Sequence, residues 1–125
     1  MNIEEFRELC LRRPGVTEET PFGPRTLVFK VCGKMFALTD MDSFESVNLK
    51  CDPERAVQLR EEHGGILPGY HMNKQHWNTV LMDGSVRNDL VRELLDHSYG
   101  LVVASLPKKV KDHLTDGSQG TGRRV

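Results

Sequence analysis

Apolar and polar residues alternate with two different periods along this chain, and each change of period marks a new element. Residues 2–13 follow a helical period. The apolar positions on the shared face are Ile3, Phe6, Leu9 and Cys10. Asn2 is suited to cap this helix, and Pro14-Gly15 predicts its end. Residues 16–24 contain two prolines and a glycine, so we expect a loop there.

The period then shortens to two, which is typical of strands with one buried face. TLVFKV (26–31) and MFALTD (35–40) predict a hairpin that turns through Cys32-Gly33 or Gly33-Lys34. Either turn keeps the same five apolar residues on one face: Leu27, Phe29, Val31, Phe36 and Leu38. SVNLKC (46–51) alternates cleanly and predicts a third antiparallel strand, with Val47, Leu49 and Cys51 inward.

A second helix is expected after Asp52-Pro53, a capping acid followed by proline at the first helical position. Gly64-Gly65 ends it. Residues 66–72 and 76–82 predict a second hairpin around Asn73-Lys74. Trp77, Thr79 and Leu81 lie on one of its faces, and Val80 and Met82 on the other.

The last third of the chain returns to the helical period. Ser85 is the expected cap of a helix that buries Leu90, Val91, Leu94 and Leu95. The apolar pattern resumes at Leu101, as a continuation or as a short further helix, until Pro107. The order α-β-β-β-α-β-β-α predicts an α+β fold, a mainly antiparallel sheet of about five strands with helices on one face. We expect one domain over residues 1–112 and a flexible tail over 113–125.

Composition places the chain among ordinary globular proteins. It has 125 residues, of which 38% are hydrophobic and 28% charged, so extensive disorder is not expected. No apolar run approaches the length of a membrane span, and the acidic N-terminus is unlike a signal peptide. Three widely spaced cysteines without a CxxC motif indicate reduced thiols, neither a disulfide framework nor a zinc site. These features predict a cytoplasmic monomer without cofactors.

The acidic residues are distributed unevenly. All 18 lie outside residues 20–39 and 63–82, the two expected hairpins. The net charge of −1 gives no general reason to expect nucleic acid, yet the hairpins themselves are positive. The pattern favours a module for double-stranded DNA that performs no chemistry, although strands also avoid acids for structural reasons. The candidate contact residues are Arg25, Lys30, Lys34, Lys50, His71, Asn73, Lys74, His76 and Trp77. Trp77 would add a stacking surface.

Two alternatives remain open. Trp77 and its neighbours could line a patch for a protein or a small ligand. An enzyme or a metal site is the other alternative, because a turn at Asn73-Lys74 would set His71 opposite His76 across the second hairpin. No third ligand is evident near this pair, and no catalytic motif is present in the sequence. A polar hairpin tip with two half-exposed histidines explains the same residues.

Several segments together resemble the MmcQ/YjbR family of small bacterial proteins. They are LVFKVCGKMFAL, VNLKCDPE leading into LREEHGGILPGYHMNKQHWNTV, and DHSYGLVVASLPKK, and the resemblance spans roughly residues 3–111. It implies a frataxin-like (CyaY-like) α+β fold and a double-wing arrangement associated with DNA binding. The positions that match the family motifs and could face a ligand are Lys30, Lys34, Lys50, Asn73, Lys74, His76 and Trp77. The frataxin-like shape also implies that iron binding is possible. For this the chain offers only a modest acidic ridge of Glu4, Glu5 and Glu8.

Overall fold

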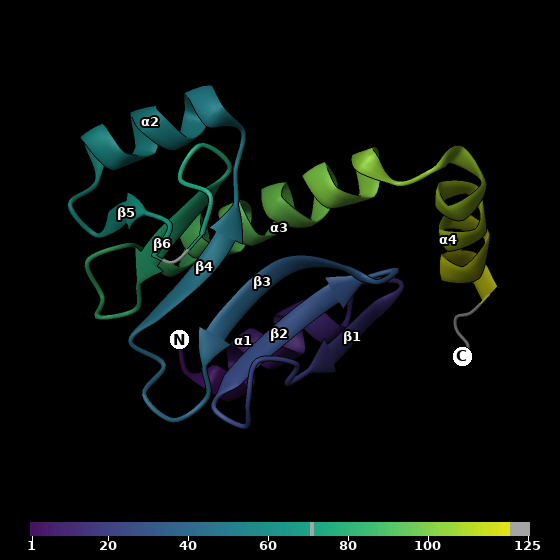
Figure 1. Ribbon diagram of the computed structural model, residues 1–125, viewed down its shortest axis with the longest axis horizontal. Helices are drawn as coiled ribbons and strands as arrows, with labels where there is room; N and C mark the ends of the chain where they lie inside the picture. Colours follow the sequence, from purple (N-terminus) through teal and green to yellow (C-terminus); the bar gives the residue numbers. More distant parts are fainter. Residues whose placement is uncertain (71, 121–125) are drawn as a thin grey trace.

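The computed structural model describes residues 1–70 and 72–120, with side chains described up to residue 114. Four helices and six strands follow one another within this part of the chain (Figure 1). In order they are α1 (Ile3–Leu11), β1 (Val16–Glu19), β2 (Thr26–Val31), β3 (Lys34–Asp40), β4 (Ser46–Lys50), α2 (Pro53–Glu62), β5 (Ile66–Pro68), β6 (Trp77–Leu81), α3 (Asn88–Ser105) and α4 (Lys108–Gly120).

The strands form one sheet in the order β1-β2-β3-β4-β6-β5, and every neighbouring pair is antiparallel. The α+β class and the antiparallel sheet are therefore as predicted. The loop expected over residues 16–24 is wrong in its first part, because Val16–Glu19 pairs with β2 as a sixth, edge strand. An edge strand needs partners for its backbone on one side only, so four residues with two acids can form it without an apolar pattern.

Helices α1 and α3 cover one face of the sheet, behind the strands in Figure 1, and the core lies between the two layers. The predicted cap of α1 is confirmed: Asn2 Oδ1 accepts from the Glu5 amide at 2.8 Å, and Glu5 accepts from the Asn2 amide in return. Asp52 caps α2 as predicted. The buried helix side chains include Phe6 and Cys10 of α1, Ala56 and Leu59 of α2, and Val91, Leu94, Leu95 and Val102 of α3.

One predicted face is wrong in β3. Phe29 pairs with Ala37 while Lys30 pairs with Met35, so Phe36 is an extra residue that shifts the register by one. Phe36 stays in the core and packs edge-on against Tyr99 with ring centroids 5.4 Å apart. After the bulge the alternation is reversed, and Leu38 pairs with Val28 on the face away from the helices.

The second hairpin is shorter than predicted. The two strands span only Ile66–Pro68 and Trp77–Leu81, and they pair from Ile66–Val80 to Pro68–Asn78, so most of residues 69–76 lie outside the sheet. The predicted faces of β6 are confirmed, since Val80 packs in the core. Ser85 does not cap α3, which begins after Arg87; Ser85 instead bonds to Asp83 within the preceding turn.

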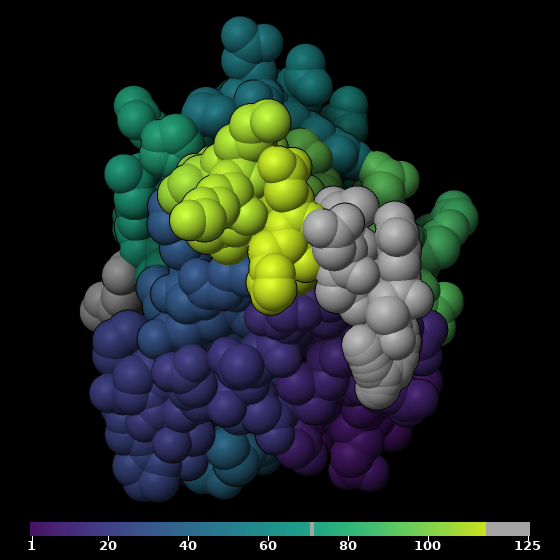
Figure 2. Space-filling model, turned by 90° about the vertical axis from the view of Figure 1, so that its right-hand side faces the viewer, coloured from purple at the N-terminus to yellow at the C-terminus, as the bar shows by residue number. Residues whose placement is uncertain are grey.

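The C-terminal apolar pattern continues α3 through Gly100 to Ser105, and a further helix, α4, follows Pro107. The tail predicted from residue 113 is therefore helical as far as Gly120; its remainder lies outside the described residues. Leu114 packs against the core next to Gly15, and Figure 2 shows the first part of α4, residues 108–114, on this side of the molecule. Among the described helices, none combines the length and the apolar character that crossing a bilayer would require.

Candidate nucleic-acid interface

The antiparallel ladders bring the two hairpins to the same end of the sheet. Val31 of β2 pairs with Lys34 of β3, and Lys50 of β4 pairs with Trp77 of β6. We call this region the double-hairpin end and define it as residues 30–36, 50, 68–70 and 72–77. Of the nine predicted contact residues, Lys30, Lys34, Lys50, Asn73, Lys74, His76 and Trp77 lie within it.

The sheet divides at this end. β3 and β4 pair only through residues 37–39 and 47–49, and beyond them Ser98 of α3 bridges the strands. The Ser98 hydroxyl accepts from the Lys50 amide at 2.9 Å and donates to the Phe36 carbonyl at 2.5 Å. In Figure 1 β3 and β4 diverge beyond this point, with α3 visible between them. Two separate hairpin arms result, β2–β3 on one side and the β5–β6 loop on the other.

The β2–β3 arm ends in a two-residue turn, Cys32-Gly33. Both residues have positive φ, 49° and 86°, as a type I′ turn requires. Lys34 follows the turn and is exposed. Lys30 is different, because its ammonium lies 3.1 Å from the Glu19 carboxylate of the unpredicted strand β1. The hydrogen bond from Lys30 lowers the pKa of Glu19, so the pair stays charged.

The described residues of the β5–β6 arm are held by polar groups of the arm itself. Lys74 Nζ donates to the Gly69 carbonyl at 3.1 Å, which folds this side chain back over the loop. Asn73 Oδ1 accepts from the Gln75 amide at 2.9 Å, so Asn73 serves the turn itself. His76 is exposed and its carbonyl accepts from Cys51. The described β5–β6 ladder ends at the pair Pro68–Asn78. His71 lies outside the described residues, and so does the predicted His71–His76 cross-strand pair.

Trp77 does not offer the stacking surface expected of it. It is only 8% exposed and lies on the sheet face away from the helices, opposite Lys50. The exposed apolar side chains of this region are Leu67 and Tyr70, 42% and 70% exposed. A patch centred on Trp77 therefore has no open apolar centre in this structure.

Arg25 lies at the opposite end of the sheet, next to the start of β2. Its Nε donates to Asp42 at 2.9 Å, and its neighbour Thr26 pairs with Asp40. Both acids lie just after residues 20–39, the stretch without acids that led us to expect a positively charged hairpin. The expectation that Arg25 belongs to the same surface as Lys34 and Lys74 is therefore wrong.

Arg60 of α2 is a cation that the sequence pattern did not assign to the site. One of its terminal nitrogens, Nη1, donates to the Lys74 carbonyl at 2.9 Å and to Asn78 Oδ1 at 3.0 Å. The sequence spacing could have indicated this role of Arg60. Arg60 lies four residues after the buried Ala56 and therefore shares its face of the helix. An arginine on that face reaches the sheet, and Arg60 is half-buried there.

The double-hairpin end differs from the rest of the molecule in how many of its cations form ion pairs. Elsewhere most of the described cations are paired with carboxylates: Arg7, Arg12, Arg13, Arg25, Arg55, Arg87 and Lys108. Within residues 1–70 and 72–114 no ion pair is found for Lys34, Lys50, Arg60 or Lys74. The arrangement can therefore attract anions.

Other chemistry is less well supported by the described residues. They include no group of three or more side chains that could hold a metal ion. Cys10 and Cys51 are buried as predicted, and burial raises the pKa of both thiols, so they are poor nucleophiles. Cys32 is exposed at the hairpin turn.

Comparison with known proteins relates both sequence and fold to one family. The family model described as YjbR matches residues 11–101. The chain is 36% identical over 115 residues to the uncharacterized protein YbdF of Escherichia coli O157:H7, which covers 91% of this chain and 94% of that protein. It is 34% identical over 110 residues to the uncharacterized protein YjbR of Escherichia coli K12, covering 87% and 93%.

Solved structures agree with this relationship. The crystal structure of DR2400 from Deinococcus radiodurans, a DUF419 domain, superposes with a TM-score of 0.86 at 41% identity, covering 91% of this chain and 88% of that one. A Pseudomonas syringae protein superposes with a TM-score of 0.70 at 29% identity, covering 81% and 98%. The chain belongs to the YjbR family.

Proposed function

We propose that this protein binds double-stranded DNA through its double-hairpin end and performs no chemical step. The observation that carries the proposal is the set of lysines without ion pairs, among the described residues, on both sides of the divided sheet: Lys34 on one arm, Lys74 on the other and Lys50 between them. Phosphate oxygens are the ligands that such amines meet on a duplex.

The distribution of charge supports contact by this end in particular. The sequence carries a net charge of −1, so its overall field does not attract a polyanion. A local surface can still do so, because at physiological ionic strength charges more than about 8 Å away are largely screened. We therefore expect weak, salt-sensitive binding with little sequence preference, since the proposed contacts are to phosphates and not to base edges.

Fluorescence anisotropy of a labelled duplex of about 20 base pairs, titrated over a range of low salt concentrations, tests the proposal. In the Lys34→Gln/Lys50→Gln/Lys74→Gln variant we expect weaker binding. The slope of log K against log salt should fall by about 0.9 for each phosphate that the variant no longer neutralises. The matched control is Arg12→Gln/Arg25→Gln/Arg87→Gln, which removes the same charge from exposed, paired positions elsewhere. Equal affinity of the two triple variants, or no binding by the parent protein at low salt, would overturn the proposal.

A further inference from the structure

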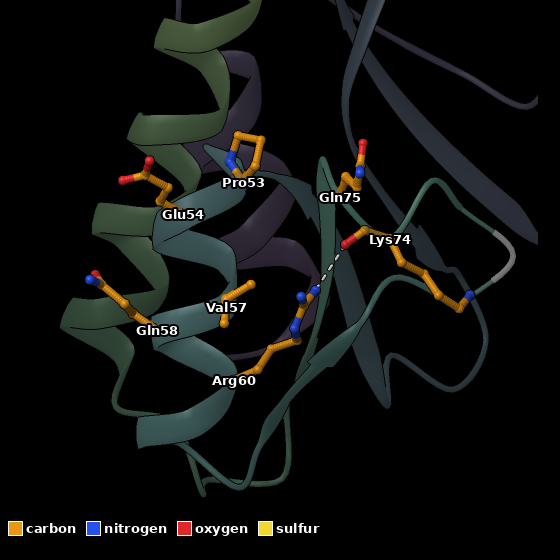
Figure 3. Close-up of a pocket in the computed structure, with 7 residues that line it drawn as sticks. All are labelled: Pro53, Glu54, Val57, Gln58, Arg60, Lys74 and Gln75. Atoms are coloured by element: carbon orange, nitrogen blue, oxygen red, sulfur yellow. Dashed lines mark hydrogen bonds between the residues drawn. The ribbon is translucent and has the colours of Figure 1, made fainter.

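A groove separates α2 from the β5–β6 loop, and of its lining residues the proposed DNA contact uses only Lys74. It is an open groove with a volume of about 510 Å³, which lies within the range of small-ligand sites. Its lining residues are Pro53, Glu54, Val57, Gln58, Arg60, Lys74 and Gln75. Figure 3 shows Val57 and Pro53 on the α2 side, and the backbone of Lys74 and the side chain of Gln75 on the loop side.

The groove has one charged group directed into it. Figure 3 shows the Arg60 guanidinium between Val57 and the Lys74 carbonyl. Only its Nη1 is engaged, and both of its acceptors, the Lys74 carbonyl and Asn78 Oδ1, are neutral. Among the described residues Nη2 and Nε have no hydrogen-bond partner, so a half-buried guanidinium keeps two directions of donation for a ligand.

The apolar wall is unusual for its helix. Val57 is 46% exposed, although the next apolar residues of α2, Ala56 and Leu59, are buried in the core. Pro53, one helical turn earlier, extends this wall. A ligand placed on Arg60 would therefore cover apolar surface, and burial of that surface favours binding by about 25 cal/mol per Å².

The charge around the groove points to a singly charged anion. Lys74 Nζ is held by the Gly69 carbonyl, and Figure 3 shows this side chain directed away from Val57 and Arg60. Glu54 also belongs to the lining, and Figure 3 shows its carboxylate directed away from Val57 and Arg60. One inward cation and one acid at the rim suit a carboxylate better than a doubly charged phosphate. Guanidinium and carboxylate also match in plane and spacing.

Two amide side chains also belong to the lining, Gln58 and Gln75, and Figure 3 shows Gln58 directed away from Val57 and Arg60. Gln75 supplies a carbonyl oxygen and an NH₂ group across from Val57, and both can bond to a peptide-like amide. We propose that this groove binds an apolar acylamino carboxylate, the chemistry of an N-acylated apolar amino acid or of the C-terminal residue of a peptide. The carboxylate lies on Arg60, the apolar side chain on Val57 and Pro53, and the amide on Gln75.

An NMR titration followed by backbone amide shifts tests this site, with N-acetyl-leucine as the probe. We expect millimolar binding, with the largest shifts at Val57, Arg60 and Gln75. N-acetyl-leucine amide, which lacks the carboxylate, should bind at least about 10-fold more weakly because it cannot form the charged hydrogen bonds. Equal binding of the two probes, or no binding of N-acetyl-leucine, overturns the proposal. Inorganic phosphate binding as tightly as N-acetyl-leucine also overturns it, since the site would then be a general anion site.

Two variants locate the contact. Arg60→Gln should weaken binding at least about 10-fold. Because this change also removes the bond to the Lys74 carbonyl, Val57→Glu serves as the second variant: it leaves Arg60 in place and repels the carboxylate from an exposed position. Arg92→Gln, on the exposed side of α3, is the matched control and should bind normally. Unchanged binding in Val57→Glu overturns the proposal.

A third experiment distinguishes the two possible sources of the ligand, a peptide or a small acid. A pentapeptide ending in leucine is compared with the same peptide carrying a C-terminal amide. Tighter binding of the free-acid peptide than of N-acetyl-leucine indicates a peptide partner, whereas weaker binding indicates a small metabolite-like acid; either result supports the site. The test does not depend on DNA, so the groove and the double-hairpin end can fail separately.

Discussion

The two ends of this sheet are built from the same strands but differ in how their polar groups are satisfied. At the end that holds Thr26, Asp40 and Ser46, cations meet acids within the molecule, as Arg25 meets Asp42. At the double-hairpin end the strands part, a helix side chain fills the gap, and Lys34 and Lys50 have no ion pair among the described residues. Arg25 at the first end is neutralised by Asp42, whereas at the second end Glu19 neutralises only Lys30 and leaves Lys34 and Lys50 able to meet anions.

The largest expected effect concerns the bridge at the divided end. Ser98→Ala leaves the Lys50 amide and the Phe36 carbonyl without their shared partner in a fully buried position, and we expect a loss of about 1–3 kcal/mol in the free energy of unfolding. Thr39→Val at the other end removes one bond, from Oγ1 to the Ser46 carbonyl at 2.7 Å, and should cost about 1 kcal/mol. Urea denaturation of both variants measures the difference. A smaller loss for Ser98→Ala than for Thr39→Val would show that the strands close without the bridge.

A smaller effect is expected when the neutralising acids are removed. Glu19→Gln releases Lys30 beside the β2–β3 arm, whereas Asp42→Asn releases Arg25 at the opposite end. Under the proposed DNA-binding function, the first change should tighten binding and steepen the salt slope by about 0.9, the contribution of one phosphate contact. The second change makes the same alteration in net charge and should leave the slope unaltered. Anisotropy titrations measure both, and equal slopes for the two variants would contradict the assignment of the contact surface to one end.

The smallest effect is a pH dependence at the junction between β4 and α2. His97 Nε2 accepts from the Asp52 amide at 3.2 Å, and its pKa is lowered, first by burial and then by the nearby Arg55 guanidinium. Its neutral form therefore contributes stability in full above the unfolded pKa of about 6.5, and this contribution is lost as the pH falls through the lower folded pKa.

His97→Gln replaces this group with an amide oxygen that can accept the same bond but does not titrate. The free energy of unfolding of the parent, measured from pH 8 to pH 4.5, should fall more steeply below about pH 6.5 than that of the variant. Asp52, Arg55 and Glu93 face His97, and Arg55 also pairs with Glu93 across the junction. All three remain in both proteins, so the difference between the curves isolates the histidine. Parallel curves would exclude this role for His97.

Much of the fold is predictable from local patterns, because helix caps and strand faces depend on near neighbours in the chain. Asn2 and Asp52 cap the helices that the sequence assigned to them. The alternation in residues 46–51 correctly places Val47 and Leu49 in the core. The bulge at Phe36 was not predictable, because an extra residue leaves the apolar composition of the strand unchanged while reversing its faces.

The candidate site was predicted in outline only. The alternation of residues along the strands and the positions of the turns predicted that Lys34, Lys50 and Lys74 lie at one end of the sheet, as they do. Whether the other candidate residues are paired or exposed depends on side chains from distant segments of the chain. Glu19 neutralises Lys30, Asp42 pairs with Arg25, and Trp77 is only 8% exposed. The spacing of residues within a hairpin does not predict these contacts.

Periodicity, turn residues and composition are properties of the chain, so they were enough to predict the class of fold, the strand order within each hairpin and the acid-free stretches. Tertiary structure alone decided that residues 16–19 form an edge strand, that β3 and β4 part around Ser98, and that Arg60 faces a groove. It also decided which cations are paired. Ion pairs and backbone pairing at an edge depend on distance through space, and residues far apart in sequence supply the partners.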